Sequence, residues 1–166
     1  MTLLVAAIAA TVAALLESTI TQYVRVGDAQ PHLVFVLAVV STVAVGLDSG
    51  LVWAFVGGIA LDTLGPRPLG ATAFALLIAV GVTNILARSL VRLRPIVAII
   101  ATALLSLVYS MTLVFLFSVL RPPQALTDPL RLLVPSVVYD VLLAVVIGPL
   151  VVSIHDRLTD EERAPR

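Results

Sequence analysis

Cysteine is absent from this 166-residue sequence, which excludes disulfide bonds and thiolate metal sites. Charge is scarce as well, because charged residues make up 12% of the chain whereas soluble domains carry about a quarter. The formal net charge is zero, which gives no reason to expect nucleic acid as a partner. Aromatic residues reach only 5%, fewer than the lining of a substrate cavity usually needs. An ordinary soluble domain is therefore excluded.

Apolar residues, in contrast, make up 60% of the chain. A transmembrane helix needs about 20 of them, so 166 residues suffice for about six crossings and leave no room for a soluble catalytic domain. We expect an all-α integral membrane protein, a polytopic bundle of about six transmembrane helices in a lipid bilayer. The six-span domain covers residues 1–154, and a short charged cytoplasmic tail covers residues 155–166.

The turns that separate the expected spans are marked by proline, glycine and charge. A brief turn at Asp48 and Ser49 separates the second span from the third. The third span is short, so we expect it to cross where the bilayer is thin, to cross at a tilt, or to lie partly inside the protein. The expected spans cover residues 2–24, 31–47, 50–65, 70–87, 96–120 and 132–154.

Arginine counts predict the orientation, since cytoplasmic loops carry the excess of basic residues. With six spans, one side holds six arginines and the other holds four, so both termini are expected in the cytoplasm. The first group is Arg88, Arg92, Arg94, Arg157, Arg163 and Arg166, and the second is Arg25, Arg67, Arg121 and Arg131.

Three acids, Glu17, Asp62 and Asp140, lie within or at the edge of expected spans, and we expect no Arg or His at comparable depth. A charge at the bilayer centre costs at least about 2.5 kcal/mol, so each acid needs an explanation. Two remain open. The acids are protonated or hydrogen-bonded to Ser, Thr, Tyr and Asn on facing ridges, or they bind a cation or proton in a transport path.

Helical spacing predicts which faces pack. Glu17 shares one face of the first span with small residues and is expected to face the bundle. Polar or small side chains recur every four residues in the last two spans and form further ridges. The third span carries its own small-residue stripe. The residues are Ala6, Ala10, Ala13 and Ala14 in the first span; Gly50, Ala54, Gly57, Gly58 and Leu61 in the third; Ala98, Thr102, Ser106 and Ser110 in the fifth; and Ser136, Asp140, Ala144 and Gly148 in the sixth.

Asp62 stands about two residues before a helix end, where the helix dipole disfavours an acid. The break after it contains two prolines and two glycines, and we expect the next helix to restart near Pro68. Asp62 is expected to reach the free N–H groups near Leu69, Gly70 and Ala71, with Arg67 as a second partner. An incidental acid in a simple connector is the alternative.

No residue pattern indicates catalysis, a cofactor or a metal. His32 lies beside a span start and is interpreted as an interfacial residue, without the paired spacing of a metal site. Serine, histidine and aspartate are too scattered to imply a nucleophilic triad. We therefore expect no enzyme activity.

Two motifs resemble a known family, the MreD family of rod-shape-determining membrane proteins. The first is Gly57-Gly58-Ile59-Ala60-Leu61-Asp62 followed by Pro68-Leu69-Gly70-Ala71, similar to that family's central helix, turn and helix start. The second comprises Val134-Pro135-Ser136, Tyr139-Asp140 and Gly148-Pro149-Leu150, similar to its last span. The family commonly has Asn where this chain has Asp140.

The resemblance implies a non-enzymatic subunit of the cell-elongation complex in the bacterial inner membrane, which supports peptidoglycan synthesis and cell shape. It implies binding to an MreC-like single-span protein and work alongside MreB, a RodA-type glycosyltransferase and a penicillin-binding transpeptidase. It also implies a fold similar to the substrate-binding subunits of energy-coupling-factor transporters, so a small-molecule or ion transport subunit is the alternative. The candidate structural or partner-binding residues are Glu17, Gly57, Gly58, Asp62, Arg67, Pro68, Gly70, Pro135, Tyr139 and Asp140.

Overall fold

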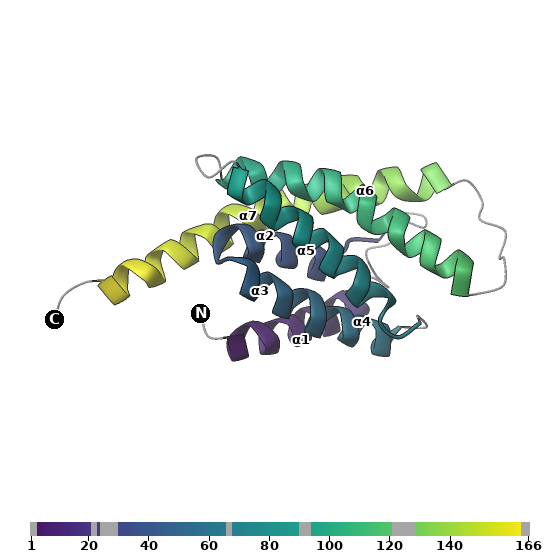
Figure 1. Cartoon of the computed structure of the whole chain (residues 1–166), viewed down its shortest axis with the longest axis horizontal. Coiled ribbons are helices and arrows are strands. Elements are labelled where there is room, and N and C mark those ends of the chain that lie inside the picture. Colours follow the sequence, from purple (N-terminus) through teal and green to yellow (C-terminus); the bar gives the residue numbers. More distant parts are fainter. Residues whose placement is uncertain are drawn as a thin grey trace.

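The computed structural model describes residues 3–20, 23, 30–65, 68–89, 94–120 and 129–163, and within these ranges it contains helices and no strand (Figure 1). Three consecutive helices join without a break, so the described chain forms six helical segments, which confirms the predicted all-α bundle. The elements are α1 (Leu3–Ile20), α2 (Leu33–Ala44), α3 (Leu47–Val52), the π-helix η1 (Trp53–Gly57), α4 (Gly58–Leu64), α5 (Ala71–Ser89), α6 (Arg94–Leu120) and α7 (Pro129–Arg163).

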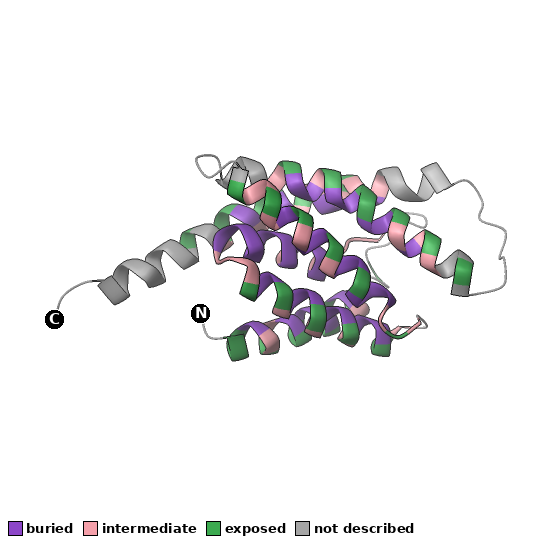
Figure 2. Ribbon diagram, viewed as in Figure 1, coloured by how far each residue is buried: buried purple, intermediate pink, exposed green. Residues whose placement is uncertain are grey.

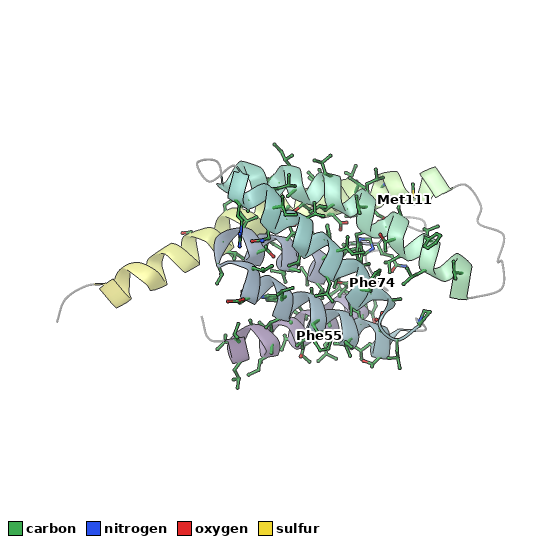
Figure 3. The ribbon with its side chains drawn as sticks, viewed as in Figure 1. Phe55, Phe74 and Met111 are labelled. Carbon is green, nitrogen blue, oxygen red and sulfur yellow. The ribbon has the colours of Figure 1, made fainter. Side chains whose placement is uncertain are left out.

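Four segments are long and apolar enough to cross a membrane, and two further apolar helices are shorter. The four are Leu3–Ile20, Leu47–Leu64, Ala71–Arg88 and Ile99–Leu116, and the shorter two are Leu33–Ala44 and Pro135–Val151. The chain is thus a polytopic membrane protein. Its outer surface carries large apolar side chains, among them Phe55, Phe74 and Met111, which suit contact with lipid (Figure 3).

Helix α2 is the centre of the bundle. It contacts α1, α3, η1, α5, α6 and α7, and ten of its 12 residues are buried (Figure 2). A helix that is apolar on every side requires such an environment. At about 1.5 Å per residue, its 12 residues span about 18 Å, well short of the roughly 30 Å hydrocarbon core. The second span is therefore shorter than the predicted 31–47.

Small residues bring the other helices close together, as predicted. On α1, Ala6, Ala10, Ala13, Ala14 and Glu17 are buried, while Ile8, Val12 and Leu15 are exposed. On the third span, a Cβ added at Gly50 would collide with Thr42, and one added at Gly58 would collide with the backbone of Ala73. Helices in lipid associate through this close approach of small residues.

The turns before the third and fourth spans lie at other positions than predicted. The turn before the third span lies at Val45 and Gly46, and α3 begins at Leu47, so Asp48 and Ser49 are helical. Gly46 has a φ of 128°, a backbone conformation that glycine adopts most readily. Likewise α5 begins at Ala71 and not near Pro68, because Gly70 has a φ of 87° and cannot belong to a right-handed helix.

Helix α7 continues to Arg163, and its C-terminal part extends away from the bundle (Figure 1). The domain boundary between residues 154 and 155 therefore falls inside one continuous helix, and the division into a membrane domain and a tail stays a prediction.

Candidate functional site

The three intramembrane acids are all buried, and each one meets backbone N–H groups at the start of a helix. The exposed fractions of Glu17, Asp62 and Asp140 are 5%, 2% and 0%. The first N–H groups of a helix have no partner within the helix, and the helix dipole makes that end electropositive. A carboxylate therefore satisfies the donors there and is itself stabilised.

Glu17 reaches α2 from the neighbouring helix α1. Its Oε2 accepts a hydrogen bond of 2.8 Å from the backbone N–H of Val34, the second residue of α2. The small face of α1 permits this contact because it brings the two helices close together. Glu17 thus faces the bundle, in agreement with the sequence prediction.

Asp140 reaches the same helix end from α7. Its Oδ1 accepts the backbone N–H of His32 at 2.9 Å, and its Oδ2 lies 3.0 Å from the His32 ring Nδ1. The Ser106 hydroxyl on α6 also donates to Oδ2. An acid hydrogen-bonded to a hydroxyl on a facing ridge was one of the two explanations left open by the sequence, and Asp140 fits it.

An aromatic group fixes the other side of the His32 ring. Tyr109 on α6 makes an edge-to-face contact with His32, with ring centroids 5.2 Å apart, and it stacks on Phe35 at 5.0 Å. Tyr109 is only 1% exposed. The imidazole is thus held between a carboxylate and a ring, both from outside α2.

Together, Glu17, His32 and Asp140 form what we term the α2 clamp. Two carboxylates from opposite sides of the bundle bind the N-terminal amides of one short central helix. In transporters with broken helices, such an N-terminus points at an anionic substrate. Here the protein's own carboxylates occupy that position.

Asp62 forms a second junction of the same kind. Both of its carboxylate oxygens accept the backbone N–H of Thr72, at 3.1 Å, near the start of α5. The predicted reach across the turn is correct, but the donor is one residue beyond the predicted Leu69, Gly70 and Ala71. Arg67, the predicted second partner, lies outside the described residues.

The remaining candidates lie near these two junctions or along α7. A Cβ at Gly57 would meet Val34, the residue that Glu17 binds, and Gly58 packs on Ala73 beside the Asp62 junction. Pro68 precedes α5, and its carbonyl accepts the Ala71 N–H at 3.2 Å. Along α7, Pro135 and Tyr139 are half-buried.

Sequence reasoning missed His32. It was interpreted as an interfacial residue, and the expectation of no histidine at the depth of the acids is wrong. His32 is 13% exposed by side chain and is bonded to the fully buried Asp140. A buried acid requires a hydrogen-bond donor, and the start of a helix offers free N–H groups. The place of His32, after Pro31 and directly before a span start, is therefore the signal in the sequence that could have identified it as a partner of a buried acid.

The structure also brings a serine, a histidine and an aspartate together, although the sequence suggested that they are scattered. Their order differs from that of a nucleophilic triad, in which histidine lies between serine and aspartate. Asp140 lies in the middle and contacts both Ser106 and His32. The contacts of Asp140 instead join α6 and α7 to the start of α2. The described residues hold no group of three His, Cys, Asp or Glu side chains suited to a metal ion.

Comparison with protein families gives a match over most of the chain. The family model described as rod shape-determining protein MreD matches residues 1–156. No curated protein and no solved structure matches the chain. The likeness of its fold to transporter subunits therefore stays a prediction.

Proposed function

The chain belongs to the MreD family and is a rod shape-determining membrane protein, and from this premise we propose that it is a non-enzymatic scaffold subunit of the cell-elongation complex. In this role it binds an MreC-like single-span protein and supports peptidoglycan synthesis. RodA-type glycosyltransferase, penicillin-binding transpeptidase and MreB are further partners of the complex. We place the protein in the bacterial inner membrane with both termini in the cytoplasm.

The observation that carries the scaffold proposal is that the three carboxylates buried in the described part of the chain are all bound within the protein. Glu17 binds Val34, Asp140 binds His32, and Asp62 binds Thr72, each through a backbone N–H group. A transport path needs acids that exchange a proton or cation. Carboxylates that cap helices hold the bundle in one arrangement, which is what a scaffold requires.

We assign the partner contact to the end of the bundle that carries the Asp62 junction. The arginine counts place this end on the outer side, where a single-span partner would present its periplasmic segment. The turn there leaves Leu69 74% exposed, and the bifurcated hydrogen bond that Asp62 accepts from the Thr72 N–H fixes the start of the helix that follows. A rigid turn with an apolar tip offers a preorganised contact.

A tagged pull-down from native membranes in mild detergent, followed by mass spectrometry, tests this function. The scaffold proposal predicts recovery of an MreC-like single-span protein together with cell-wall synthases. Recovery of an ATPase pair with a coupling membrane subunit would instead support the transport alternative. The variant Gly81→Ala, in which the added Cβ meets nothing within 4 Å, is expected to recover the same partners as the parent protein.

A further inference from the structure

Burial repeats every four residues along the third span, which comprises α3, η1 and α4. Each repeat has two buried residues followed by an exposed one. The buried pairs are Ser49 and Gly50, Trp53 and Ala54, Gly57 and Gly58, and Leu61 and Asp62, and the exposed residues are Leu51, Phe55, Ile59 and Thr63. A regular α-helix has about 3.6 residues per turn, so a repeat of four drifts around it by about 40° each time. Over three repeats, Asp62 would turn about 120° away from the face that carries Gly50.

The π-helical turn η1 removes most of this drift. It covers Trp53–Gly57, in the middle of the repeat. Hydrogen bonds in a π-helix join residues five apart, whereas those in an α-helix join residues four apart, so the turn takes up one residue more. One surplus residue corresponds to about 100° of rotation, which is close to the drift of about 120°.

Contacts with α5, which runs alongside the third span, give the same count independently (Figure 1). Gly50 packs against Val80 of α5. Gly58 packs against Ala73, nearer the start of α5. The two positions on α5 are seven residues apart, about two turns of an α-helix, whereas the two glycines are eight residues apart. A regular third span would therefore turn Gly58 about 80° away from α5.

We propose that the π-helical turn is a register device, which holds one surplus residue and thereby directs Asp62 at the start of α5. After the turn, Gly58 rests on Ala73. The Asp62 carboxylate then meets the Thr72 N–H. Phe55 is the residue that a regular helix can spare, because it lies at the centre of the turn and is 56% exposed. Any effect on partner capture rests on the function proposed above, which assigns the contact to the end that Asp62 fixes.

Deletion of Phe55 tests whether the turn holds a surplus residue. The shortened span can form a continuous α-helix with only about 20° of drift left, so both of its halves keep their buried faces. We expect the Tm in detergent to stay within about 5 °C of the parent, and hydrogen exchange at Thr72 to stay within about threefold. Phe55→Ala is the control, because it loses the side chain but keeps the residue.

Deletion of Ile78 is the matched comparison, because this residue is also exposed, at 37%, but lies in the regular helix α5. With no surplus residue to absorb the loss, one part of α5 turns by about 100° relative to the other. We expect this deletion to lower the Tm by about 10 °C or more.

Two results would overturn the proposal. One is a Phe55 deletion as unstable as the Ile78 deletion while Phe55→Ala resembles the parent. The other is hydrogen exchange at Thr72 that is as fast in the Phe55 deletion as in Asp62→Ala. A Phe55 deletion with the Tm and Thr72 exchange of the parent supports the register device whether or not it captures the MreC-like protein. Failure of the proposed function is thereby distinguished from failure of this inference.

Discussion

The Asp140 carboxylate binds His32 twice, through the backbone N–H at 2.9 Å and through the ring Nδ1 at 3.0 Å. The two residues are 108 positions apart in sequence. This contact ties α7 to the entry of α2 and fixes the orientation of the imidazole, which also contacts Tyr109. Loss of this carboxylate is therefore expected to loosen both α7 and the start of α2.

Replacement of Asp140 by Ala is expected to destabilise the protein by about 3 kcal/mol, because it leaves donors from His32 and Ser106 buried without an acceptor. Asp140→Asn keeps one oxygen and is expected to cost less. Thermal unfolding in detergent, followed by circular dichroism, measures both. Val146→Ala, at a 72% exposed position of the same helix, serves as the control. Equal Tm values for Asp140→Ala and the control would contradict the role of this carboxylate.

Two variants of Glu17 separate the role of its oxygen as a hydrogen-bond acceptor from the role of its charge. Glu17→Gln retains an oxygen for the Val34 N–H, so its Tm should stay within a few degrees of the parent. Glu17→Ala removes the acceptor and should lower stability by about 1–3 kcal/mol. A Glu17→Gln variant as unstable as Glu17→Ala would show that the charge matters more than the hydrogen bond.

Close helix packing at Gly58 is tested by a matched pair of glycine substitutions. Gly58→Ala places a methyl group against the Ala73 backbone and is expected to cost about 1–3 kcal/mol. Gly81→Ala meets nothing within 4 Å, so the better helix propensity of alanine should raise stability by about 0.5–1 kcal/mol. The sign of the difference in Tm decides the test, and a Gly58→Ala variant at least as stable as Gly81→Ala would refute the packing.

The Asp62 junction is expected to control local order at the start of α5. Asp62→Ala removes both acceptors of the Thr72 N–H, so hydrogen exchange should become faster at Thr72 and its neighbours. Capture of the MreC-like partner should weaken in the same variant, whereas Asp62→Asn should preserve most of it. Faster hydrogen exchange together with unchanged partner capture would show that the Asp62 junction orders α5 but does not form part of the proposed partner contact.

Local patterns in the sequence predicted most of the architecture. The buried face of α1 and the small-residue stripe of the third span follow from helical spacing alone, as do the two ridges that contain Ser106 on α6 and Asp140 on α7. The His32–Asp140 pair could not be predicted this way, because a contact between residues 108 positions apart depends on how the helices assemble. The start of α5 was misplaced for a different reason. Glycine accepts several backbone conformations, so the sequence alone does not show that the backbone of Gly70 is in the left-handed region.

The central claim is that the intramembrane acids serve as helix caps and not as transport groups. The double variant Glu17→Gln/Asp140→Asn tests it most directly, since both amides keep an acceptor oxygen but neither can exchange a proton. We predict that cells relying on this variant remain rod-shaped and that it captures the MreC-like protein as the parent does. Loss of rod shape by a variant that reaches the membrane in normal amounts and captures its partner would contradict the account.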